Sequence, residues 1–320
     1  MNKEELLQCV KEKIGKLSIK FPQRIGLQEN NHVITLTMQD SMAKNMQDDS
    51  AAFEGWALCL EAGLDAESMK CCLKWEKPPD PKGLHYQRFL YRVDRFNSIF
   101  GGSNGWFFID DESKEFMVDL EIKDDKEYFL NFPSTRDEER KNDKTKNIES
   151  RLENEILGQQ DNLKDLKKLC PATLHRQLPV GLFHEKVRTT NAIFPIKHSA
   201  IDLWGVNGDD LYILELKAKG NCKVGVLSEL FFYTMVLRDE QAGRFVRKSD
   251  EGKSIGNTNQ IKAFILAPEL HPFITQKVFD LLNEKSINQK MEFGYINFEY
   301  EETEHKLKFN SFNKGALECY

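Results

Sequence analysis

The clearest alternation of apolar and polar positions lies between residues 199 and 220, where two apolar runs flank a short polar turn. The runs SAIDLWGV and LYILELKA are rich in β-branched, aliphatic and aromatic residues, which favour strands. Asn207 and Gly208, followed by two aspartates, tolerate the positive φ angles of a tight turn. The pattern therefore predicts two antiparallel strands joined by a short loop.

Helical and strand-like patterns alternate on both sides of this hairpin. Before it, an apolar stripe at near-helical spacing predicts a helix over residues 147–169, and a short strand follows at 177–183. Pro179 favours an edge or bulge position for that strand. After the hairpin the pattern predicts a strongly apolar helix, a buried strand, an amphipathic helix and a further strand at 224–238, 261–267, 272–285 and 291–300.

The first part of the chain predicts a separate domain of mixed α+β type over residues 1–132. Its expected elements are an opening helix, two later helices at 51–62 and 86–100, two strands at 32–38 and 72–75, and a hairpin over 106–123. Residues 133–146 are polar and highly charged, which is typical of a linker. We therefore expect an α/β protein with an N-terminal domain, this linker and a C-terminal domain over residues 147–320.

Composition agrees with this division and narrows the setting. The 320 residues are 40% hydrophobic and 30% charged, enough for two compact cores. The net charge of −6 argues against a surface coated in positive charge. Seven cysteines without zinc-site spacing indicate free thiols in a reducing compartment. With no signal peptide and no apolar run of membrane length, the sequence predicts a cytoplasmic protein that has no membrane partner.

Three polar residues interrupt the apolar hairpin strands: Asp202 in the first, and Glu215 and Lys217 in the second. If residues 208–209 form the loop, Asp202 lies directly opposite Glu215; if residues 207–208 form it, Asp202 faces the neighbour of Glu215 on the same face. A three-residue loop would place the two carboxylates on opposite faces. An even loop therefore brings all three polar side chains to one face.

Two carboxylates in an apolar patch repel each other and lose hydration unless a cation lies between them. Oxygen ligands suit a hard divalent ion, so we expect Mg²⁺ or Mn²⁺ at Asp202 and Glu215, with help from the carbonyl of Leu216. Lys217 is expected to orient an attacking water or to neutralise charge on a phosphate. The alternative interpretation is an ordinary solvated sheet face with cross-strand ion pairs.

A second acidic motif is a weaker candidate for the same chemistry. Glu121 and Lys123 repeat the E-x-K spacing, with Asp110 upstream. Asp110, however, falls in a polar turn, and Lys123 runs into a cluster of solvated charges. The sequence therefore favours the motif on the hairpin.

The order of elements around Asp202, Glu215 and Lys217 resembles the PD-(D/E)xK nuclease superfamily, over residue 147 to the C-terminus. This resemblance implies a restriction-endonuclease-like αβββαβ core, metal-dependent hydrolysis of phosphodiester bonds, and a further metal-binding and catalytic glutamate on the first helix. We assign that role to Glu153, which flanks the apolar stripe. Glu149 and Glu155 stay open as alternatives.

Two positions differ from the motifs of this superfamily. Ile201 stands where the name-giving motif has proline, and Glu229 stands where RecB-like members have the glutamine of a Gln-x-x-x-Tyr motif that here ends at Tyr233. The stretches RQLPVGLF and SAIDLWG also resemble bacterial proteins of this group, some of them tied to defence against phage. The resemblance implies an intracellular nuclease, and DNA is the substrate we expect.

Basic residues around the motif are candidates for phosphate contacts. We expect nucleic-acid contacts from Arg188, Lys219, Lys223 and, by the resemblance, Tyr233. Further basic residues lie nearby at Lys186, Arg244, Arg247 and Lys248. The N-terminal domain is expected to recognise the substrate or a protein partner, and a homo-oligomer is compatible with the sequence. The alternative function is a nuclease-like fold that binds nucleic acid or protein without cleavage.

Overall fold

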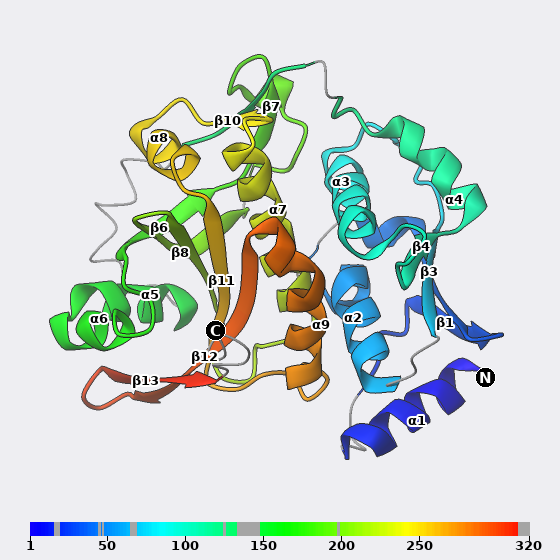
Figure 1. The fold of residues 1–320 in the computed structure, drawn as a ribbon, viewed down its shortest axis with the longest axis horizontal. Helices are drawn as coiled ribbons and strands as arrows, with labels where there is room; N and C mark the ends of the chain where they lie inside the picture. Colours follow the sequence, from blue (N-terminus) through cyan, green and yellow to red (C-terminus); the bar gives the residue numbers. More distant parts are fainter. Residues whose placement is uncertain are drawn as a thin grey trace. The chain divides into compact units, whose positions relative to one another are not determined.

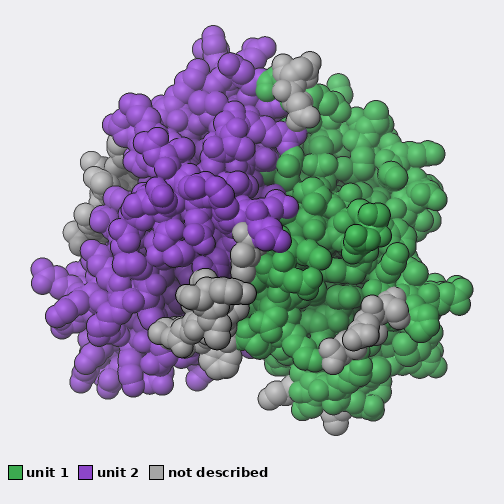
Figure 2. Space-filling view, in the orientation of Figure 1, with its two compact units in different colours: residues 1–126, 223–229, 271–286 green, residues 127–222, 230–270, 287–320 purple. Residues whose placement is uncertain are grey.

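The computed structural model describes residues 1–15, 20–43, 46, 48–64, 69–123, 126–132, 148–196 and 199–312. These residues form two compact units, which are coloured green and purple in Figure 2. The first unit is Met1–Lys126 with the later segments Lys223–Glu229 and His271–Ser286, and the second unit holds the rest of the chain. The sequence division assigned both later segments to the C-terminal domain. The predicted linker at 133–146 lies outside the described residues.

The first unit contains a four-stranded sheet with helices (Figure 1). The strand order is β1-β2-β3-β4, with β1 antiparallel to β2 and the other pairs parallel. The elements are α1 (Lys3–Ile14), β1 (Ile25–Asn30), β2 (Val33–Met38), η1 (Asp40–Ala43), η2 (Asp49–Ala51), α2 (Phe53–Leu64), β3 (Lys70–Trp75), α3 (Leu84–Phe100), β4 (Phe107–Ile109), α4 (Asp111–Glu115), η3 (Phe116–Asp119) and α9 (Gln276–Ser286).

The predicted hairpin over residues 106–123 is wrong. Phe107 in β4 pairs parallel with Cys71 in β3, and a helix follows the strand instead of a turn. Asp110 caps that helix, because its side chain accepts a hydrogen bond from the backbone N of Ser113. The polar run that indicated a hairpin turn is therefore a helix N-terminus, and Asp110 is a structural cap.

The second unit carries the predicted motif. Its elements are β5 (Tyr128–Leu130), α5 (Ile148–Gly158), α6 (Gln160–Leu166), β6 (Thr173–Pro179), β7 (Leu182–His184), η6 (Thr189–Asn191), β8 (Ala200–Asn207), β9 (Asp210–Leu216), α7 (Gly225–Gln241), β10 (Phe245–Val246), α8 (Asp250–Gly256), β11 (Gln260–Ala267), η7 (Ile287–Gln289), β12 (Met291–Glu301) and β13 (Lys306–Phe312). The first residues of α7 belong to the first unit.

A mixed six-stranded sheet organises this unit in the order β13-β12-β11-β9-β8-β6. The pairs β6–β8, β8–β9 and β12–β13 are antiparallel, while the pairs β9–β11 and β11–β12 are parallel. Apolar side chains of α5 and α6, such as Leu152 and Ile156, share a core with Leu203, Leu214 and Leu216 of the sheet. The mixed α/β class is therefore confirmed for this chain.

Two predicted elements of the second unit have different boundaries. The helix expected at 147–169 is divided into α5 and α6, because Gly158 ends one helix and Gln159 adopts extended angles before the next. The strand expected at 177–183 begins earlier, at Thr173, and ends at Pro179. The edge position indicated by Pro179 is confirmed, since β6 is the terminal strand of its sheet.

Candidate functional site

The hairpin of β8 and β9 closes with a two-residue loop at positions 208–209. Asn207 pairs with Asp210, Gly208 takes a φ of 57°, and the described ladder extends to the Leu203–Leu214 pair. One further step of the same register sets Asp202 opposite Glu215. This is the first of the two even-loop registers, and it puts the two carboxylates on the same face of the sheet.

Asp202 lies where its strand stops supplying backbone partners to β9. The backbone N of Lys217 donates to the carbonyl of Leu266 on β11, at 2.9 Å, so the preceding amide points the other way. That amide, the backbone N of Leu216, donates to Oδ2 of Asp202 at 2.8 Å. The carboxylate of half-buried Asp202 thus takes the place of a strand carbonyl, which fixes its orientation.

Glu215 and Lys217 form a buried ion pair beside Asp202. Their exposed fractions are 2% and 9%, and the Lys217 ammonium donates to Oε1 of Glu215 at 2.6 Å. Burying two charges is costly, and the short charge-assisted contact offsets part of that cost. A buried ion pair at the end of β9 is therefore poorly explained by stability alone.

Glu153 approaches the same region from α5. Its carboxylate is buried, and Oε2 accepts from Nε of Arg176 at 2.9 Å while Oε1 accepts from Nε2 of Gln177 at 3.0 Å. Burial raises the pKa of Glu153, and the charge and hydrogen bonds of Arg176 act in the opposite direction. Nε2 of Gln177 also donates to Oδ1 of Asp202 at 3.4 Å. Glu153 is thereby linked to Asp202 through one amide.

The other two glutamates of α5 have different partners. Glu149 accepts from the backbone N of Ala218 at 3.2 Å and from Nδ2 of Asn221 at 2.6 Å, which holds the segment after β9. Glu155 lies 2.9 Å from Nδ1 of His305. Of the three alternatives, Glu153 is the glutamate that the described contacts connect to Asp202.

A hard cation fits two of the predicted ligands. Within the described ranges, no group of three or more His, Cys, Asp and Glu side chains has the geometry of a metal site. The hairpin register nevertheless puts the carboxylates of Asp202 and Glu215 on one face of the sheet, and Mg²⁺ is commonly held by one or two carboxylates together with water and substrate phosphates. The carbonyl of Leu216 stays a predicted ligand, while its N–H is engaged by Asp202.

The predicted nucleic-acid contacts differ in accessibility. Arg188 and Lys219 are exposed in the second unit, and Lys223 is exposed in the first. Tyr233 is only 1% exposed within α7. A ring so buried cannot stack on a base while the helix stays in place, so the predicted contact of Tyr233 is not supported by its position.

Arg247 is a structural residue and does not belong to a basic surface. Its guanidinium is buried and pairs with both oxygens of Glu240, at 3.0 and 3.1 Å. It also donates to the carbonyls of Asn131 and Pro179. The neighbouring Lys248 is exposed, and its ammonium lies 4.2 Å from the ring centroid of Phe129.

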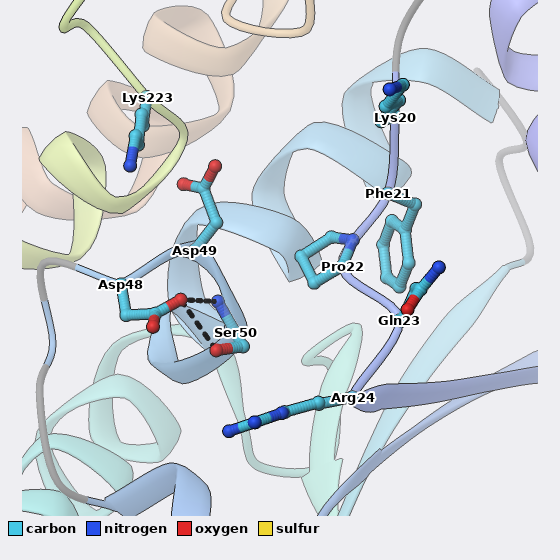
Figure 3. Close-up of a pocket in the computed structure, with 9 residues that line it drawn as sticks. All are labelled: Lys20, Phe21, Pro22, Gln23, Arg24, Asp48, Asp49, Ser50 and Lys223. Carbon is cyan, nitrogen blue, oxygen red and sulfur yellow. Dashed lines mark hydrogen bonds between the residues drawn. The ribbon is translucent and has the colours of Figure 1, made fainter.

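A pocket of about 490 Å³ in the first unit, absent from the sequence predictions, is lined by basic and acidic side chains (Figure 3). Its basic residues are Lys20, Arg24 and Lys223, and its carboxylates are Asp48 and Asp49. Hydrogen bonds from Ser50 lower the pKa of Asp48, and the charges of Lys223 and Arg24 add to this. The pocket therefore combines three cations with two carboxylates and carries no strong excess of either charge.

Sequence reasoning missed Arg176 and Gln177, which contact Glu153 from β6. The only signal in the sequence is that two polar residues stand together at the start of the predicted strand, with Arg176 just before it and Gln177 as its first residue. No protein-family model, curated protein or solved structure matches the chain. Within the part of the chain that the structure describes, no helix has the length and apolar character needed to cross a membrane.

Proposed function

We propose that this protein is a divalent-metal-dependent nuclease that hydrolyses phosphodiester bonds of DNA. The observation that carries the proposal is the hairpin register, which sets Asp202 opposite Glu215 one step beyond the Leu203–Leu214 pair, with the Lys217 ammonium bonded to Glu215. Acidic oxygens and an amine gather here in strands that are otherwise apolar. Such a group is costly to bury, which favours a chemical role over a purely structural one.

The fold is compatible with this proposal. The chain passes through helix α5, strands β6, β8 and β9, helix α7 and strand β11, which is the element order that we expected for the αβββαβ core. The proposal therefore includes a restriction-endonuclease-like core. The carboxylates come from the middle strands of the sheet, β8 and β9.

Each polar residue of the site has a separate role in the proposal. Asp202 and Glu215 would hold Mg²⁺ or Mn²⁺, which supplies positive charge to the phosphate and lowers the pKa of water. Lys217 carries a proton and three N–H donors, so it can release Glu215 and donate to an attacking water or a phosphate oxygen. Glu153 acts on Asp202 through Gln177 in the described arrangement.

The basic residues proposed to contact the DNA backbone are Arg188, Lys219 and Lys223. All three are exposed, and phosphate contacts by such side chains fix the register of a nucleic acid without reading its sequence. They belong to loops beside β7, after β9 and before α7. We propose that the first unit recognises the substrate or a protein partner.

The test is cleavage of plasmid, linear DNA and RNA by the purified protein with Mg²⁺, Mn²⁺ or EDTA. We expect cleavage of DNA that EDTA stops, and loss of both cleavage and Mn²⁺ binding in Asp202→Ala. Lys217→Ala should lose cleavage but keep Mn²⁺ binding, because a protonated ammonium has no lone pair for a metal. The matched control is Asp209→Ala, which removes an exposed carboxylate from the loop of the same hairpin.

Undiminished cleavage in both Asp202→Ala and Glu215→Ala would refute the assignment of the site. Binding of DNA without cleavage under any metal would instead favour the non-cleaving binding module. A contaminating nuclease is excluded if the Asp209→Ala protein, prepared in the same way, cleaves while the Asp202→Ala protein does not.

A further inference from the structure

Gln177 has a backbone conformation that is rare inside a strand. Its φ is 52°, in the left-handed region that costs most residues other than glycine about 1 kcal/mol or more. The other described non-glycine residues with positive φ are Asn31, His32, Glu185, Lys290 and His305, and each lies in a turn or next to a strand end. Among the described non-glycine residues with positive φ, Gln177 is thus the one that lies within a strand.

A strand bulge does not explain this conformation. A bulge inserts an extra residue, so the register changes from one side of it to the other. Here Arg176 pairs with Leu203 and Leu178 pairs with Ile201, which is the same register on both sides. Gln177 therefore stands opposite Asp202 with no residue inserted, and the strain serves another purpose.

The side chain of Gln177 shows what the conformation achieves. Its Nε2 donates to Oε1 of Glu153 at 3.0 Å and to Oδ1 of Asp202 at 3.4 Å. A side-chain amide has two N–H donors on one nitrogen, and here each is directed at a different carboxylate. Asp202 is then held on both oxygens, by Gln177 on one and by the backbone N of Leu216 on the other.

Arg176 makes this arrangement possible by neutralising Glu153. Its guanidinium lies 2.8 Å from Oε2 of Glu153 and also donates to Oδ1 of Asn154. Without that cation, two carboxylates on one amide would repel each other. The pair Arg176 and Glu153 therefore anchors Gln177 from the helix side, and the amide carries the restraint to Asp202.

We propose that Gln177 is a positioning residue, whose strained backbone aims its amide at Asp202 and fixes that carboxylate for cation binding. The inference rests on the proposed function, since the cation is part of it. Partners that orient a metal ligand typically contribute about 10- to 100-fold to metal affinity.

The first test is Mn²⁺ titration by calorimetry on the full chain. Gln177→Gly accepts the positive φ without strain but has no amide, so its unfolding midpoint should be unchanged or higher while Mn²⁺ binds about 10- to 100-fold more weakly. Gln177→Met keeps the side-chain length without the donors and should weaken binding as much. Lys290→Gly, another positive-φ position, is the control and should bind Mn²⁺ like wild type.

The second test needs no metal. Amide hydrogen exchange at Leu216 reports its bond to Asp202, and the neighbouring amide of Lys217, bonded to Leu266, is the reference. In Gln177→Gly the exchange of Leu216 should accelerate relative to Lys217. An unchanged ratio overturns the positioning role, whether or not the protein binds a metal.

The two tests separate this inference from the proposed function. If wild type binds no Mn²⁺, the proposed function fails, and the exchange ratio alone decides whether Gln177 orients Asp202. If wild type binds Mn²⁺ and Gln177→Gly binds it equally well, the proposed function stands and the positioning role is wrong.

Discussion

Two buried ion pairs, one in each unit, show how differently the same charges can be held. In the first unit, Arg92 donates from two nitrogens to both oxygens of Glu54 and also to the carbonyl of Ala51, at 2.9 Å. In the second unit, the ammonium of Lys217 lies 2.6 Å from one oxygen of Glu215. The first pair is completely buried, whereas the second keeps some exposure.

The difference lies in the geometry of the cations. A guanidinium is a rigid fork that matches a carboxylate, and another of its donors is bonded to the backbone of the same unit. An ammonium is a compact charge on a flexible stem, so it can turn to another oxygen without rebuilding its surroundings. The Arg92 pair is therefore suited to stability and the Lys217 pair to exchange of partners.

The largest effect is expected from breaking the structural pair. Arg92→Met leaves the buried carboxylate of Glu54 without its cation, which should lower the free energy of unfolding by about 3–5 kcal/mol. Urea unfolding of the variant measures it. The double variant Arg92→Met/Glu54→Leu should be more stable than Arg92→Met alone, because no uncompensated charge remains. Equal stability of wild type and Arg92→Met would remove the contrast between the pairs.

Lys217→Met should have a smaller effect that depends on metal. Glu215 loses its cation while it stays buried, and we expect a loss of about 1–3 kcal/mol in EDTA, because the Lys217 pair keeps more exposure than the Arg92 pair. Mn²⁺ at about 100 times its dissociation constant should add about 2.7 kcal/mol and restore the stability. Thermal or urea unfolding with and without Mn²⁺ checks this.

The matched control for that experiment is Arg92→Met under the same conditions. Mn²⁺ should stabilise this variant no more than it stabilises wild type, since Glu54 belongs to the first unit and is not a proposed metal ligand. If Mn²⁺ stabilises Lys217→Met no more than Arg92→Met, the ion pair at Lys217 is structural, like the ion pair at Arg92.

Glu61 is a half-buried carboxylate, and no ion pair of Glu61 is found among the described residues. Its Oε2 is buried without a hydrogen-bond partner in the described part of the chain, and burial raises its pKa to about 7. Below about pH 4.5 the group is protonated whether folded or unfolded. As pH rises to about 7, only the unfolded state loses its proton, so the free energy of unfolding falls.

The expected fall is about 1–2 kcal/mol, after allowing for the partial contact of Glu61 with water. Glu61→Gln removes the titration, so the difference in unfolding free energy between variant and wild type should grow between pH 4.5 and 7. Urea unfolding across this range measures it, with Glu12→Gln, an exposed glutamate of α1, as the control. A difference in unfolding free energy that stays constant with pH would show that burial does not raise the pKa of Glu61.

The sequence predicted the register of the hairpin better than the contacts that surround it. Alternation of apolar residues and the turn at Asn207 and Gly208 are local signals, so the register that sets Asp202 opposite Glu215 was among the expected ones. The contacts of Glu153 were not predictable in the same way. They depend on how α5 packs against β6, and on a positive φ at Gln177 that no residue preference indicates.

The same contrast applies to the basic residues and to the fold. Lys219 and Arg247 are both basic residues in the sequence. In the structure Lys219 is exposed, whereas Arg247 is buried against Glu240 of α7. The five polar residues after β4, Asp110 to Lys114, also looked like a turn, because capping by Asp110 uses the residue types of turns. Burial and long-range pairing, which decide both cases, are properties of the folded chain.

The smallest effect is expected for the two lysines that follow the motif. Exposed Lys219 has no described ion pair, whereas the charge of Lys223 is shared with Asp48 in its pocket. If both contact DNA phosphates, Lys219→Ala should reduce the slope of log affinity against log salt by about 0.9, and Lys223→Ala by less. DNA binding by the Lys217→Ala protein, which we expect not to cleave, measures both slopes in Ca²⁺ buffer at several salt concentrations. Lys290→Ala, which removes a lysine that donates to Asn259, is the control. A larger slope change for Lys223 than for Lys219 would mean that Asp48 leaves the lysine on DNA binding, and that the pocket of the first unit takes part in substrate recognition.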